Sequence, residues 1–131
     1  MERTNTVYMG GHYLKKGELA HELFHAYQKK MGQGGESIHN EVEAYMFQAL
    51  LDNDFFLLSQ RSGMNGKDED YNLAVINLFC NRDYSNFDKY FNTITKGFKN
   101  NAVANEKGTY KDMDDSINQK KTNLVKQFFL P

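Results

Sequence analysis

Apolar side chains recur every three or four residues through most of this chain, and this spacing buries one face of an α-helix. Four such stretches predict helices, at Gly17–Met31, about Ser37–Ser59, Asp68–Asn81 and Asp83–Phe98. A fifth helix is predicted at Asp112–Phe129, where acids come first and lysines later, the order that a helix dipole favours. The only proline is the last residue, which suits a chain made mostly of helices.

The segments between and before these helices predict shorter elements. Glycine and polar residues predict a turn at Arg61–Lys67 and a loop at Lys99–Lys111. Polar and apolar residues alternate from Thr4 to Met9, which predicts a short strand that Gly10 and Gly11 end. We therefore expect a mainly α fold. It would be classed as α+β, because a short N-terminal edge strand or hairpin precedes the helices. Residues 1–131 fit one domain.

The same periodicity predicts which side chains form the core. The third helix would bury Leu73, Ile76, Leu78 and Phe79, and the fourth Phe87, Tyr90, Phe91 and Ile94. Cys80 follows an apolar run and is expected to be a buried, inert thiol. As the single cysteine, it excludes a disulfide within the chain.

The pentapeptide His21-Glu22-Leu23-Phe24-His25 is the stretch that indicates a chemistry. Two imidazoles four residues apart on a helix can bind one metal ion, and the glutamate between them can act on a water. The histidines share a polar stripe with Glu18, Gln28 and Lys29, and the opposite face carries Leu19, Ala20, Leu23, Phe24, Tyr27 and Met31. The alternative is a pair of solvated histidines on a surface helix.

A catalytic zinc site needs a third protein ligand, and the next predicted helix offers one. On a helical wheel Glu41, Tyr45, Gln48 and Asp52 form one polar stripe, whereas Glu43 points about 160° away among apolar residues. The polar stripe favours Glu41 as the ligand. Glu43 is the alternative if this helix is rotated.

His21-Glu22-x-x-His25 followed by Asn40-Glu41 resembles the gluzincin zinc metallopeptidases, which include thermolysin-like enzymes and smaller one-domain relatives. The resemblance covers about Val7 to Tyr45. It implies a zincin-like active-site helix pair, followed here by additional C-terminal helices. It also implies that His21, His25 and Glu41 bind Zn²⁺ and that Glu22 is the general base and acid in peptide-bond hydrolysis.

Two features depart from the family pattern. Tyr45 stands where the family often has an acid that orients a zinc-bound histidine, so Glu18, Gln28 or Asp52 would take that role. Only some twenty residues precede His21, so the domain is either minimal or truncated at its N-terminus. These departures leave open an alternative function, a catalytically inactive zinc-binding interaction module that retains the site.

The resemblance also suggests where a substrate would bind. In the family an edge strand before the motif helix pairs with the extended substrate, and Asn5–Met9 could be that strand. The donor for the tetrahedral oxyanion would be Tyr45, His12 or His39. For His39 we favour a simpler role at the start of the helix, and for His12 a place in a loop.

Charge and hydropathy restrict the partners. The net charge of −1, with Lys and Arg spread along the chain, gives no electrostatic reason to expect nucleic acid or an anionic membrane. No apolar stretch has transmembrane length, and no signal peptide is evident. The chain as written would be cytoplasmic, or secreted if it is a fragment without its leader. The expected partner is a peptide or protein substrate, and the sequence indicates no oligomeric state.

Overall fold

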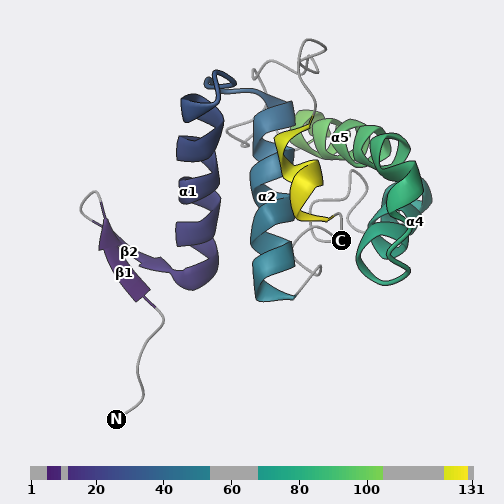
Figure 1. Ribbon diagram of the computed structural model, residues 1–131. Helices are drawn as coiled ribbons and strands as arrows, with labels where there is room; N and C mark the ends of the chain where they lie inside the picture. The colour runs from purple at the N-terminus through teal and green to yellow at the C-terminus, as the bar shows by residue number, and fades with distance from the viewer. Residues whose placement is uncertain (1–5, 10–11, 54–67, 105–122, 130–131) are drawn as a thin grey trace.

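The computed structural model describes residues 6–9, 12–53, 68–104 and 123–129, and the side chains of 17–53, 68–100 and 123–129. Within these residues the chain is mainly α, as predicted (Figure 1). The helices are α1 (Lys16–Lys30), α2 (Ile38–Asp52), α4 (Glu69–Phe79) and α5 (Phe87–Ala104). Two short 3₁₀ helices accompany them, η1 (Tyr84–Asn86) and η2 (Leu124–Phe128).

A two-stranded antiparallel hairpin precedes the helices. It consists of β1 (Thr6–Met9) and β2 (His12–Lys15), with Val7 opposite Leu14. The predicted strand is therefore one half of a hairpin. Because β2 ends where α1 begins, the hairpin lies next to the N-terminal end of the helix that carries the histidines.

Helices α1 and α2 lie side by side and run in opposite directions (Figure 1). The chain reverses at Gly32, whose φ of 80° is readily adopted only by glycine, while the Gln33 N–H donates to the carbonyl of Gln28 at 2.8 Å. Ser37 then caps α2 by accepting a hydrogen bond from the Asn40 N–H at 3.0 Å. This short turn places the motif helix against the predicted ligand helix.

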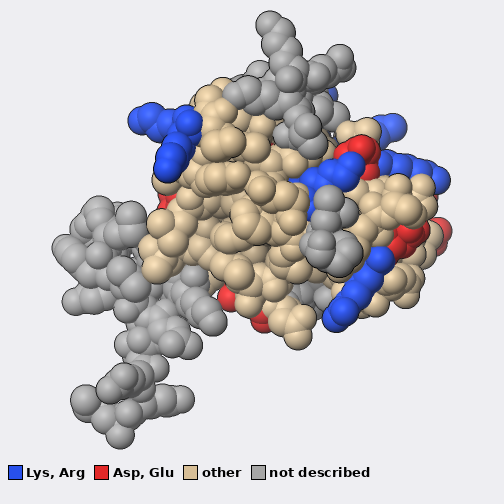
Figure 2. Space-filling model, in the orientation of Figure 1, with Lys and Arg blue, Asp and Glu red and all other residues tan. Residues whose placement is uncertain are grey.

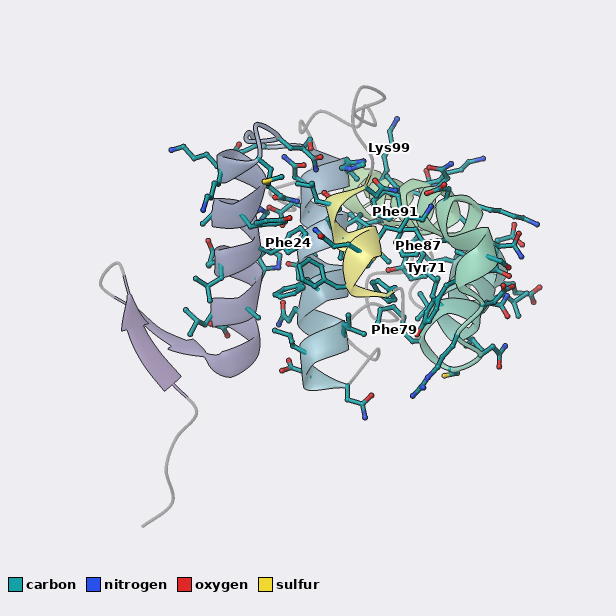
Figure 3. The ribbon with its side chains drawn as sticks, in the orientation of Figure 1. Phe24, Tyr71, Phe79, Phe87, Phe91 and Lys99 are labelled. Carbon is teal, nitrogen blue, oxygen red and sulfur yellow. The ribbon has the colours of Figure 1, made fainter. Side chains whose placement is uncertain are left out.

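The core joins α2 to the other helices. Figure 3 shows Phe24 between α1 and α2, and Phe87 and Phe91 on the other side of α2. The segment η2 and the residue after it close the core with Val125 and Phe129, both buried. As predicted, Phe87, Phe91 and Ile94 of α5 are buried, whereas Tyr90 is half-buried.

Two predicted core faces were partly wrong. In α4, Leu73 is 56% exposed and Ile76 is 40% exposed. The face that packs on α5 instead contains Tyr71, Ala74, Val75 and Leu78. Both sets have helical spacing, so periodicity alone did not decide which set faces a neighbour.

In α1 the difference bears on the site. Leu23 and Met31 of the predicted apolar face are exposed, while His21 and Gln28 of the predicted polar stripe are buried. The polar stripe lies against α2 because polar groups of α2 form hydrogen bonds with His21 and Gln28. The sequence pattern of α1 alone does not contain those partners.

Other expectations also need correction. Cys80 is exposed rather than buried, because it lies in the turn after α4 and not within the helix. Helix α2 ends at Asp52, where Asn53 adopts a left-handed φ of 50°, and α5 continues to Ala104 through the start of the predicted loop. Of the predicted fifth helix only its last residues are described, and they form η2. The predicted turn at 61–67 lies outside the described residues.

The surface carries no single dominant charge on the face shown in Figure 2, where Lys and Arg stand apart around a largely uncharged area. Of the helices in the described ranges, none is both long and apolar enough to cross a membrane.

Candidate metal centre

Three side chains from α1 and α2 converge on one point. Nε2 of His21 and Nε2 of His25 are 3.0 Å apart. Glu41 places one carboxylate oxygen 3.1 Å from the first nitrogen and the other 3.0 Å from the second. One ligand atom from each residue lies within 4.8 Å of the others, so this group could hold a metal ion.

The geometry fits a tetrahedral metal. Two ligand atoms about 2.05 Å from a zinc ion at tetrahedral angles are roughly 3.3 Å apart, slightly more than the separations found here. The side chains of His21, His25 and Glu41 are 11%, 26% and 14% exposed. A partly exposed group can hold a metal and still admit water and a substrate.

The electrostatics of the group favour a cation. Burial would raise the pKa of Glu41, but hydrogen bonds with His21 and His25 outweigh it and lower the pKa from 4.5 to about 2. The hydrogen bond with Glu41 raises the pKa of His25 against the effect of burial. The site thus holds an ionised carboxylate beside two imidazole nitrogens, a donor set that suits Zn²⁺ and other divalent ions.

The neighbours of the group differ from one candidate residue to the next. Glu22 is exposed. After the larger effect of Glu41, the charge of Glu22 is among the causes that raise the pKa of His25. The ring of Tyr45 packs edge-on against His21 with centroids 4.4 Å apart, so Tyr45 lies beside the metal-ligating group.

The two other proposed oxyanion donors have different outcomes. His39 is only 1% exposed, lies 3.5 Å from Glu43 and packs against the ring of Phe91 at 5.0 Å. It therefore belongs to the core at the start of α2, which agrees with the simpler role. His12 lies in β2 rather than in a loop, and its side chain is outside the described residues.

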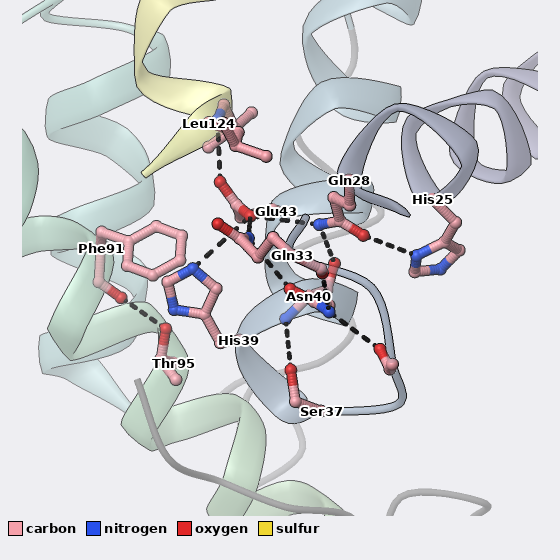
Figure 4. Close-up of polar contacts among 12 residues, drawn as sticks. His25, Gln28, Gln33, Ser37, His39, Asn40, Glu43, Phe91, Thr95 and Leu124 are labelled. Carbon is pink, nitrogen blue, oxygen red and sulfur yellow. Dashed lines mark hydrogen bonds and ion pairs between the residues drawn. The ribbon is translucent and has the colours of Figure 1, made fainter. Parts of the chain in front are cut away.

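Glu43, the alternative third ligand, belongs to a separate buried network (Figure 4). Its carboxylate is fully buried and accepts hydrogen bonds from Nε2 of Gln28, from Nε2 of Gln33 and from the Val125 N–H. These donors surround the carboxylate, and neither motif histidine contacts it among the described interactions. Glu43 is therefore not part of the metal-ligating group.

Gln28 connects the two sites. Its Oε1 lies 2.9 Å from Nδ1 of His25, and its Nε2 donates to the Asn40 carbonyl at 3.0 Å and to Glu43 at 3.1 Å. Of the three residues predicted to orient a histidine, Gln28 makes the contact, whereas Glu18 and Asp52 are exposed. The sequence feature that indicates this contact is the position of Gln28, three residues after His25 on the same helix.

A cavity of about 650 Å³ lies between α4 and α5, and no residue of the metal-ligating group lines it. Comparison with protein-family models, curated proteins and solved structures finds no match to this chain. The case for a function therefore depends on the geometry of the three converging side chains.

Proposed function

We propose that this protein is a zinc-dependent metallopeptidase of the gluzincin type, with the metal held by His21, His25 and Glu41. The observation that carries the proposal is the convergence of these three side chains from adjacent antiparallel helices. When bound, zinc would lower the pKa of a water molecule towards neutrality and polarise a peptide carbonyl.

Glu22 is the proposed general base and acid. Its carboxylate is exposed on the same helix as both histidines, where it can take the proton of the attacking water. The water oxygen first forms a C–O bond with the carbonyl carbon, and the peptide C–N bond then breaks as Glu22 passes the proton to the leaving amine. This course needs no Ser or Cys nucleophile.

The hairpin is the proposed substrate edge. Within the described residues β1 pairs with β2 along one edge only. The backbone N–H and C=O groups along its other edge have no strand partner there. An extended peptide can add to such an edge as a further strand. Since β2 runs directly into α1, a peptide bound there would lie close to the motif helix.

Digestion of a peptide library by the zinc-loaded chain and by Glu22→Gln tests the proposal. We expect the substitution to reduce turnover by about 10²–10⁴-fold, because it removes the proton-transfer group, and to leave the zinc content unchanged. The matched control is Glu18→Gln, an exposed glutamate one turn earlier on α1, which should keep full activity. If wild type and Glu22→Gln give the same digestion pattern, the peptidase proposal is wrong and the zinc-binding interaction module is the better interpretation.

A further inference from the structure

The amide of Gln28 is held in one orientation by its partners. Its Nε2 has two acceptors, the Asn40 carbonyl oxygen and Oε1 of Glu43. A carbonyl oxygen and a carboxylate oxygen accept hydrogen bonds and cannot donate them, so the group that faces them must be the NH₂ end of the amide. A flipped amide would place an oxygen against two oxygens in a site where Gln28 is only 1% exposed.

The orientation of the Gln28 amide determines which ring nitrogen of His25 carries the proton. With the NH₂ end committed, Oε1 of Gln28 faces Nδ1 of His25 at 2.9 Å. That oxygen can only accept, so the hydrogen bond requires a proton on Nδ1. A neutral His25 with its proton on Nδ1 has a lone pair on Nε2, the atom that faces His21 and Glu41.

We propose that Gln28 is a positioning residue of the metal centre. Its fixed amide holds the ring of His25 through Nδ1–H, so that Nε2 is turned towards the metal. Glu43 acts one step further away by holding the amide of Gln28. This inference depends on the proposed metal site and adds to it a buried hydrogen-bond chain from His25 through Gln28 to Glu43, shown in Figure 4.

Gln33 provides a matched control. Like Gln28, it is a buried glutamine whose Nε2 donates to Glu43 Oε1 and to an oxygen of Asn40, in this case Oδ1 at 3.0 Å. Unlike Gln28, its Oε1 contacts no histidine; it is buried without a hydrogen-bond partner among the described atoms. Replacing either glutamine by methionine removes a similar pair of donors, and only one replacement removes the support of His25.

The experiment compares wild type, Gln28→Met and Gln33→Met as full chains. Zinc affinity is measured by competition with a chelator, and Tm is measured without metal. In the zinc-loaded form, ¹H–¹⁵N NMR of the histidine rings detects whether the Nδ1–H of His25 is protected from solvent exchange. This resonance reports the hydrogen bond itself, which a general loss of stability does not remove.

We expect Gln28→Met to weaken zinc binding about 10–100-fold, the usual effect of losing a partner that orients a ligand, and to lose the protected Nδ1–H signal. Gln33→Met should lower the Tm by a similar amount but keep both the affinity, within about threefold, and the signal. Equal weakening in the two variants, or wild-type affinity in Gln28→Met, would overturn the inference.

If Gln28→Met does not fold, the wild-type spectrum alone tests whether Gln28 positions His25. An unprotected Nδ1–H, or zinc on Nδ1 of His25, would contradict a role for Gln28. A wild-type chain that binds no zinc would overturn the metal site as well. Failure of the positioning role alone leaves wild-type zinc binding intact, so the two failures are distinguishable.

Discussion

Glu41 and Glu43 are two residues apart near the start of α2, yet they have different environments. Glu41 is partly exposed, and its two oxygens face two imidazole nitrogens. Glu43 is completely buried, and its carboxylate accepts hydrogen bonds from amide groups of three segments, the end of α1, the turn after it and η2.

The difference between the two glutamates shows that the partners decide what a carboxylate can do. Imidazole nitrogens have lone pairs and can bind a metal together with Glu41. Glu43 also lies 3.5 Å from one imidazole nitrogen, Nε2 of His39, but amide N–H donors already satisfy its oxygens, and these donors have no lone pairs for a metal. Glu41 is thus suited to binding a ligand, whereas Glu43 holds separate parts of the chain together.

Removing each carboxylate from the metal-free protein should give the largest contrast. We expect Glu43→Ala to lower the free energy of unfolding by roughly 3 kcal/mol or more, because it leaves several buried donors without an acceptor. Glu41→Ala should cost less than Glu43→Ala, since the Glu41 carboxylate keeps some access to water and has two hydrogen-bond partners. Urea unfolding in the presence of a chelator measures both, and equal losses would remove the distinction.

The sequence predicted the environment of some of these residues and not of others. The spacing of His21 and His25, and the place of Glu41 on a polar stripe, were sufficient to predict that these three side chains meet. The burial of Gln28 was not predicted, because it depends on acceptors supplied by Asn40 and Glu43 from another helix.

The fold shows the same limit. Helical periodicity identified α1, α2, α4 and α5, but Leu73 and Tyr71 both lie at helical spacing, and only packing against α5 decides which is buried. The Ser37 cap after Gly-bearing residues marks the start of α2, whereas its end at Asn53 depends on a left-handed backbone that the sequence signals weakly.

Zinc should bind beside Glu41, where the two motif histidines lie, and should stabilise the folded protein by doing so. A ligand that binds only the folded state at a free concentration of 100 times its Kd adds about 2.7 kcal/mol. We therefore expect zinc to raise the Tm of wild type and to leave the Tm of His21→Ala unchanged. Thermal unfolding with and without zinc measures the effect; an equal rise in both proteins would place the metal elsewhere.

A variant destabilised at the contact between α4 and α5 tests whether zinc binding simply follows stability. A Cβ at Gly97 in α5 would lie 2.4 Å from a ring carbon of the buried Tyr71, so Gly97→Ala should cost about 1–2 kcal/mol. Its zinc affinity should equal that of wild type when measured by chelator competition. Weaker zinc binding in this variant would show that the site depends on global stability.

Asp83 offers a third carboxylate, partly exposed to solvent, and the smallest expected effect. Hydrogen bonds, first from Tyr90 and then from Asn86 and Ser85, lower its pKa from 3.8. A lowered folded-state pKa stabilises the protein above 3.8 and ceases to do so as the pH falls through the folded value. Asp83→Asn should therefore lower the Tm slightly at pH 7 and not at pH values well below the ordinary pKa; a pH-independent difference would contradict this.

The zinc content of the full chain after equilibrium dialysis, measured by elemental analysis, decides whether His21, His25 and Glu41 form a metal site. We predict about one zinc per chain in wild type, close to none in Glu41→Gln, and the wild-type value in Glu36→Gln, an exposed glutamate before α2. Absence of zinc from wild type, or undiminished zinc in Glu41→Gln, would show that these three side chains do not form a zinc site.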